Sequence, residues 1–291
     1  MTSTRVAGIR QSWWLGIMCI VAFVLAFWPT FRWLAERFDA SDSFYSHGWL
    51  VPFASAWLIW RQRALLESIP KQGSRAALLL LALSLLMHVG ATWLHLGFVS
   101  GVSMLGTLYA LVAVAWGWRV FWALRFPLLF LLFMIPLPGI VLITASFHMK
   151  LMAAGLATMC LRLLGLHAVQ AGSMIRVPGV SVVVDDTCSG LRSLISLVAL
   201  ATIWTSIMPA HSTRWQKVTM VGASVPIALI ANMVRILVLV LLAAIYGAQI
   251  TDTFIHYGSG LVVFGIALAA LAWLSRVFER WRTAHPCALK S

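Results

Sequence analysis

The stretch VVVDDTCSGLRSL, residues 182–194, gathers residue types that can do chemistry inside a chain that is otherwise mostly apolar. Cys188 is the one cysteine of four with polar neighbours, because Cys19 and Cys160 lie in apolar runs and Cys287 lies in a basic tail. No two cysteines have the CxxC spacing of a metal or redox site. A thiol needs a lowered pKa to act as a nucleophile near neutral pH, and the N-terminal end of a helix supplies a partial positive charge. We expect Cys188 at such a helix end, which makes it the candidate nucleophile.

Two residues in later apolar stretches could complete a reactive site: Arg235 in ANMVRILVLV and His256 in FIHYGSG. A charge at the centre of a membrane span costs about 2.5–3.5 kcal/mol, so Arg235 needs a reason to be there. Cysteine and histidine form a nucleophile and acid–base pair, and an arginine can stabilise the oxyanion of a tetrahedral intermediate. Each residue also has a structural alternative: Arg235 can snorkel or pair with Asp185 or Asp186, Cys188 can be a small packing residue, and His256 an interfacial anchor. The two aspartates oppose formation of a thiolate unless they face away or bind a cation.

The elements that must position these residues are membrane helices. The chain is 62% hydrophobic and only 10% charged, whereas soluble domains carry roughly 25% charged residues. Several apolar runs approach the roughly 20 residues that cross a bilayer. The first run lacks a small-x-small cleavage site and is predicted to be an uncleaved span. We therefore predict an all-α polytopic membrane protein that forms one integral membrane domain over residues 1–291. The eight predicted spans are 12–29, 47–60, 76–96, 98–117, 121–138, 188–208, 218–246 and 254–275.

Charged residues sort to opposite sides of this arrangement. Fourteen of the 21 basic residues fall on one side, namely Arg5, Arg10, Arg61, Arg63, Lys71, Arg75, Arg119, Arg125, Arg214, Lys217, Arg276, Arg280, Arg282 and Lys290. Six of the eight acids fall on the other, namely Glu36, Asp39, Asp42, Asp185, Asp186 and Asp252. Basic residues collect in cytoplasmic loops, so both termini are predicted to be cytoplasmic, with a basic tail at 276–291. The net charge of +13 thus reflects topology, and no separate basic domain is present to bind nucleic acid.

This topology brings the three candidate residues to one depth. Cys188 opens the sixth predicted span and His256 opens the eighth, both at the outer end. Arg235 lies 17 residues after Val218, where the seventh span begins inside. At about 1.5 Å per residue this is a rise of roughly 25 Å. All three are therefore predicted near the extracytoplasmic face.

Two segments between the fifth and sixth spans have other patterns. In residues 139–166, Thr144, His148, Gly155 and Arg162 recur at helical spacing, which favours a helix lying in the outer interface. A hairpin that re-enters the membrane is the alternative. Residues 173–184, SMIRVPGVSVVV, are β-branched around a Pro-Gly pair and predict a small extracytoplasmic β-hairpin.

The order of these motifs resembles the exosortase/archaeosortase family. The resemblance rests on TCSGLRSL, then NMVR, then a histidine that opens the last span. Two further stretches are similar as well, YSHGWLVPFASAWLIW and FPLLFLLFMIPLP. The similar region covers roughly residues 40–275.

This resemblance implies a cysteine transpeptidase-like enzyme of the bacterial inner membrane. Such enzymes act on secreted proteins whose C-terminal tail has a Pro-Glu-Pro-type motif, a membrane helix and a basic segment. The tail is cut at the motif, and the protein passes to an acceptor, which can be an amine, a hydroxyl, a lipid or a polysaccharide. By position, Cys188 is the nucleophile, Arg235 the charge stabiliser and His256 the acid/base, and no cofactor or metal is expected. Many members have Glu two residues before the cysteine, where this chain has Asp186.

Six further residues are expected to line the site: Asp186, Ser189, Gly190, Arg192, Asn232 and His47. Gly190 is predicted to allow another backbone to approach closely. His47, in YSHGW, falls near the outer face, where it can line the site or anchor an aromatic belt.

Two other functions remain open at this point. One is a transporter or channel in which Arg235 binds an anion. The chain has no inverted repeat and no matching pair of Gly- or Pro-broken spans, and this argues against a transporter. The other is a non-peptidase transferase in envelope polysaccharide assembly.

Overall fold

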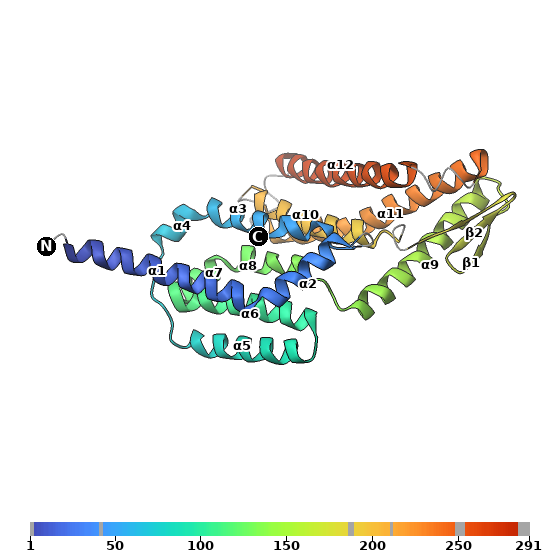
Figure 1. Cartoon of the computed structure of the whole chain (residues 1–291). Coiled ribbons are helices and arrows are strands. Elements are labelled where there is room, and N and C mark those ends of the chain that lie inside the picture. The colour runs from blue at the N-terminus through green and yellow to red at the C-terminus, as the bar shows by residue number, and fades with distance from the viewer. Residues whose placement is uncertain (1–2, 41–42, 186–188, 210–211, 248–253, 285–291) are drawn as a thin grey trace. The chain divides into compact units, whose positions relative to one another are not determined.

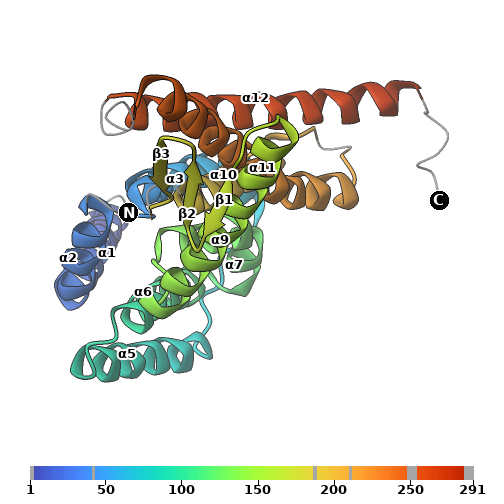
Figure 2. The ribbon, with the colours of Figure 1, turned by 90° about the vertical axis from the view of Figure 1, so that its right-hand side faces the viewer.

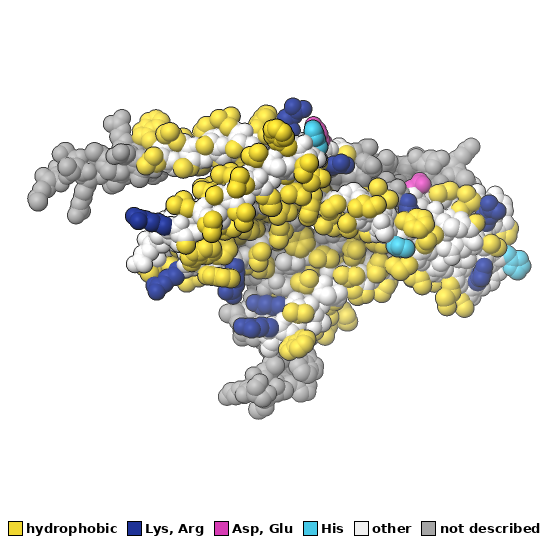
Figure 3. Space-filling model, turned by 90° about the horizontal axis from the view of Figure 1, so that it is seen from below, with side chains coloured by type: hydrophobic (Ala, Val, Ile, Leu, Met, Phe, Trp, Pro, Cys, Tyr) yellow, Lys and Arg dark blue, Asp and Glu magenta, His cyan; other side chains and the backbone are white. Residues whose placement is uncertain are grey.

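The computed structural model describes residues 3–40, 43–185, 189–209, 212–247 and 254–284. The chain forms two compact units (Figure 1). The first comprises residues 1–40 and 46–136, and the second comprises residues 41–45 and 137–291. Hydrophobic side chains cover much of the described surface, as expected of a protein in contact with lipid (Figure 3).

All the regular elements of the first unit in its described part are helices. Its elements are α1 (Ser3–Ala26), α2 (Trp28–Asp39), η1 (Ser46–Trp49), α3 (Leu50–Arg61), α4 (Arg63–Ser68), α5 (Ala77–Trp93), α6 (Gly97–Trp116), α7 (Trp118–Ala123), α8 (Arg125–Phe130) and η2 (Leu131–Met134). In its described residues the second unit combines four helices with a small sheet. Its elements are α9 (Gly139–Leu163), β1 (Val169–Ala171), β2 (Met174–Val177), β3 (Val180–Val183), α10 (Leu191–Ile207), α11 (Arg214–Tyr246) and α12 (Phe254–Ala284).

Four of the described helices are long and apolar enough to cross a membrane: Gly97–Trp116, Gly139–Leu163, Arg214–Tyr246 and Gly258–Arg280. The pair Trp14–Ala26 and Trp28–Asp39, bent by 62°, is a fifth candidate if it forms one span. The other predicted spans coincide with shorter helices, such as the 12-residue α3 and the 17-residue α5. At about 1.5 Å per residue, 17 residues rise roughly 25 Å, less than the roughly 30 Å hydrocarbon core. The predicted span 121–138 is divided among α7, α8 and η2.

A buried histidine supports the bend between α1 and α2. Pro29 stands in the first turn of α2, where its missing N–H favours a new helix start. The last carbonyls of α1 need partners from outside the helix, and the Ala26 carbonyl lies 3.0 Å from His88 Nε2. The other ring nitrogen lies 3.0 Å from the Ser100 hydroxyl, and the ring centroid is 4.1 Å from that of Phe27. His88 thereby ties the bend to α5 and α6.

The sheet of the second unit contains the predicted hairpin. β2 and β3 pair antiparallel, with Val177 opposite Val180, so Pro178-Gly179 forms the turn as expected. Gly179 has a φ of 83°, which glycine adopts without strain. The three-residue β1, too short to read from the sequence, pairs with β2. The sheet lies beside α9 (Figures 1 and 2).

The core beneath the sheet joins it to α9 and α11. Its buried members are Ala153, Ala154, Ala157, Leu161, Ala168, Ile175, Val177, Val184, Ile236, Leu239 and Val240. The segment before β1 is fixed by Arg162, whose Nε donates to the Ala168 carbonyl at 2.7 Å. Val182 of β3 and Val184 just after it are packed in this core with α11, shortly before the motif that contains Cys188.

The helix α9 corrects one of the two interpretations of residues 139–166. It runs without a break for 25 residues, so the re-entrant hairpin is wrong. Of its predicted polar stripe, Thr144, His148 and Arg162 are exposed, and Gly155 is half-buried. Its length and apolarity also qualify α9 as a membrane span, which the eight-span prediction did not include.

Candidate active site

Arg235 is buried in the second unit and reaches from α11 to α12. Its side chain is 7% exposed, and its Nε donates to the Ser259 hydroxyl at 3.1 Å. A Cβ built on Gly260 would lie 3.7 Å from the guanidinium carbon, so the guanidinium packs on the backbone of α12 there. Asp185 is exposed, and no ion pair joins it to Arg235 within the described part of the chain.

Position 256 lies on α12 one turn before Ser259 and Gly260, the residues that Arg235 contacts. The described part of α12 runs from Phe254 and so includes this position. Ser259 and Gly260 follow His256 by three and four residues, and residues at these spacings share a helix face. Arg235 therefore contacts α12 one turn after His256, whose side chain lies outside the described set.

Gly190 brings the start of α10 against α11. It adopts a left-handed φ of 78° immediately before the helix. A Cβ at this position would lie 2.6 Å from Cγ and 2.9 Å from Cβ of Asn232, closer than real side chains approach. Asn232 is 4% exposed and stands one turn before Arg235 on α11. Close approach was predicted for another backbone, and the structure places the Asn232 side chain there.

Two other predicted site residues lie at the start of α10. Ser189 is 1% exposed, and its hydroxyl accepts the Leu191 N–H at 3.3 Å. Arg192 is half-buried in the first turn of the helix. α10 begins at Leu191, three residues later than the predicted span. Cys188 and Asp186 lie outside the described residues.

Contacts thus connect three of the predicted elements. Gly190, which follows Cys188 by two residues, packs on Asn232, and Arg235 of the same α11 face bonds to α12 near His256. Among the described residues, no group of three His, Cys, Asp or Glu side chains could hold a metal ion.

A family model described as "Transmembrane exosortase" matches residues 37–273. The chain belongs to this family. The match covers most of the chain, extends over both units and confirms the resemblance seen in the motifs. No curated protein and no solved structure matches this exosortase.

The YSHGW motif of this exosortase divides between the two units. His47 lies half-buried in η1 of the first unit, whereas Arg235 belongs to the second. Gly48 has a packing role, because a Cβ there would overlap the Phe38 ring. Trp49 donates its indole N–H to Asp39 at 2.9 Å.

Tyr45, from the same motif, belongs to the second unit. Its phenol oxygen accepts the Leu137 N–H at 3.3 Å. Burial raises the pKa of Tyr45 above its ordinary value, and the bond from Leu137 acts in the opposite direction. Through this bond Tyr45 holds the segment that leads into α9.

Sequence reasoning missed Ser259 and Gly260 as neighbours of Arg235. Both stand in the quoted FIHYGSG motif, three and four residues after His256. That spacing was the available signal, because it places them on the histidine's face of the helix.

Proposed function

We propose that this exosortase is a membrane cysteine endopeptidase and transpeptidase. Its substrates are secreted proteins with a C-terminal tail made of a Pro-Glu-Pro-type motif, an apolar helix and a basic segment. The observation that carries the proposal is the bond from Arg235 to Ser259, one turn after His256. A buried guanidinium beside the helix that carries the acid/base is suited to stabilise negative charge on a reacting carbonyl.

The proposed reaction has two steps. The Cys188 thiolate attacks the carbonyl carbon of the scissile peptide, and Arg235 stabilises the oxyanion that forms. The intermediate collapses with breakage of the C–N bond, and protonated His256 gives its proton to the leaving amine. This leaves a thioester between Cys188 and the protein to be transferred.

In the second step an acceptor resolves the thioester. Neutral His256 takes the proton of an incoming amine, hydroxyl or water, whose nucleophilic atom attacks the thioester carbonyl. The C–S bond then breaks, and the Cys188 thiolate is regenerated. We place the site at the outer face of a bacterial inner membrane, a position supported by the sorting of basic residues along the chain.

Cleavage of a tagged substrate tests this proposal. The enzyme is co-expressed with a secreted reporter protein carrying the three-part tail, and release of the tail is followed by mass. Cys188→Ala and Cys188→Ser should abolish release while the enzyme remains in the membrane. A variant in which Cys19, Cys160 and Cys287 are all changed to Ala is the control and should retain activity.

The intermediate has its own signature. Hydroxylamine cleaves thioesters, so it should convert the reporter to a C-terminal hydroxamate only when Cys188 is present. Full tail release by Cys188→Ala would exclude the cysteine mechanism. A parent enzyme that never releases the tail would favour transport or polysaccharide assembly instead.

A further inference from the structure

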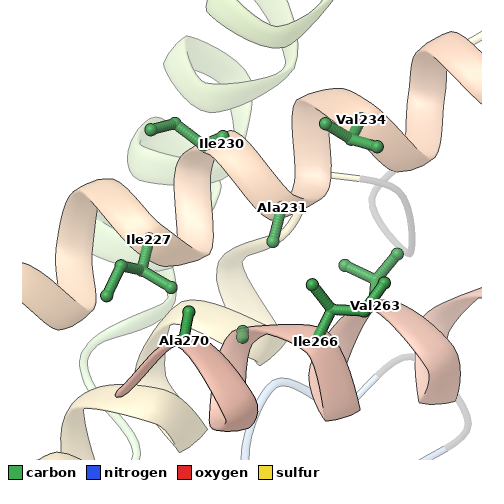
Figure 4. Close-up of a pocket in the computed structure, with 8 residues that line it drawn as sticks. Ile227, Ile230, Ala231, Val234, Val263, Ile266 and Ala270 are labelled. Carbon is green, nitrogen blue, oxygen red and sulfur yellow. The ribbon is translucent and has the colours of Figure 1, made fainter. Parts of the chain in front are cut away.

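An aliphatic groove lies between α11 and α12 in the second unit (Figure 4). Its volume is about 210 Å³, and its lining is aliphatic throughout. Ala231 of α11 and Ala267 and Ala270 of α12 leave room between the helices, while Ile230 and Ile266 are each 58% exposed. The groove is therefore an open apolar surface.

One end of the groove meets the candidate active site. Val234, in the lining, immediately precedes Arg235, and Val263 follows Gly260 by three residues. On α11 the lining runs from Ile227 to Val234, a distance of seven residues. At about 1.5 Å per residue the groove extends roughly 10 Å along α11.

We propose that this groove seats the apolar helix of the substrate's C-terminal tail. The inference rests on the proposed function and adds the surface that holds the substrate. In such a tail the helix follows the cleavage motif closely, so the tether delivers its first turns to an apolar surface next to Arg235. The groove's length matches about two turns of helix.

Two properties of the groove favour a helix as the occupant. Small residues let helix backbones approach closely, and helix association in membranes depends on such packing. α12 is also the least covered of the four long candidate spans, since only 17% of its most apolar stretch is buried. The groove therefore has the small residues and the open flank that a third helix requires.

Charge sets the direction of the tail in the groove. Lys217 and Arg280 stand on α11 and α12 beyond the Ile227 end of the groove, and Arg214 and Arg276 add to the positive charge there. Basic segments of membrane proteins collect on the cytoplasmic side. With the cleavage motif at Arg235 and the apolar helix in the groove, the basic segment of the tail reaches the same end as these residues, so the two chains have the same orientation in the membrane.

Site-specific photo-crosslinking tests whether the apolar helix of the substrate binds in this groove. A benzophenone amino acid replaces Ile266 in the full-length Cys188→Ala enzyme, which is co-expressed with the tagged reporter so that the tail stays attached. The matched control carries the probe at Leu261, which is outside the groove and more exposed, at 77%. We expect several-fold more crosslinked reporter from position 266. Equal yields at the two positions, or crosslinks only to lipid or to a second copy of the enzyme, would overturn the inference.

Filling the groove gives an independent test in the active enzyme. Ala270→Leu projects into the groove, whereas Ala269→Leu adds the same side chain at the neighbouring exposed position outside it. Because the added side chain overpacks the groove against the substrate helix, Ala270→Leu should lower tail release at limiting substrate roughly tenfold. Ala269→Leu should match the parent, and both variants should be equally abundant. Equal release by the two variants would overturn the seat while leaving the proposed function intact, whereas absence of release by the parent enzyme would count against the proposed function.

Discussion

Replacing Gly190 by alanine should damage both the stability and the activity of this exosortase. Two costs add at this position. A non-glycine residue in the left-handed region, here φ 78°, costs about 1–2 kcal/mol. The new methyl would also lie 2.6–2.9 Å from three atoms of Asn232, and overpacking costs about 1–3 kcal/mol. The expected loss of unfolding free energy is therefore roughly 2–5 kcal/mol.

The contact has a further consequence for the reaction. The Asn232 Cβ is one of the three atoms, so rotation of the side chain cannot relieve the clash, and the start of α10 must move. Cys188 precedes Gly190 by two residues and would move with it. A displacement of about 1 Å at a reacting group can cost 10²-fold in rate. Tail release should fall by more than the loss of folded enzyme explains.

Two variants separate the costs in an SDS-unfolding titration of the purified enzyme in detergent micelles. Gly172→Ala is the control for backbone strain, because Gly172 has a φ of 64° and open space around its missing Cβ. It should lose only about 1–2 kcal/mol. The second variant adds Asn232→Ala to Gly190→Ala. Because this change removes two of the three clashing atoms, the double variant should regain part of the stability that Gly190→Ala loses. Equal losses for the two glycine variants, with no gain from Asn232→Ala, would refute the packing argument.

Three further predictions address charge, topology and the first unit. Arg235→Lys should lower the rate of tail release by about 10²–10³ at normal abundance, because an ammonium lacks the planar fork of donors; a rate near that of the parent would make Arg235 a structural residue. A reporter active only outside the cytoplasm should be on when fused after Val184 and off when fused after Arg63, and the reverse pattern would put the site on the wrong face. His88→Ala should lower the unfolding free energy by at least about 1–3 kcal/mol, because the Ala26 carbonyl loses a buried partner; an unchanged SDS-unfolding midpoint would contradict this role.

The hairpin was predictable because its signals are local. Pro178 and Gly179 supply the backbone angles of the turn, and β-branched residues flank them. The sequence did not predict α9 as a membrane span, because a polar stripe is typical of a helix that lies in the membrane interface. Hydropathy also detects apolar composition rather than helix breaks. It therefore merged α7, α8 and η2 into one span, although Pro127 cannot donate a helical hydrogen bond.

The candidate site was predictable in its residue types and not in its contacts. The burial of Asn232 and its packing on Gly190 depend on how α10 packs against α11. No local sequence pattern predicts that packing. The same holds for the bond from Arg235 to Ser259. Both contacts join residues far apart in the sequence, so they arise from tertiary packing alone.

The spacing of the NMVR motif follows from these two contacts. Asn232 and Arg235 are three residues apart, so they share one face of α11 and differ in height by about 4.5 Å. From that face Asn232 reaches the start of α10, while Arg235 reaches α12. One residue more or less between them would turn one side chain by about 100° relative to the other and break one of the contacts. The motif therefore has the spacing that lets one helix hold both of its neighbours, the segment after Cys188 and the helix that carries His256.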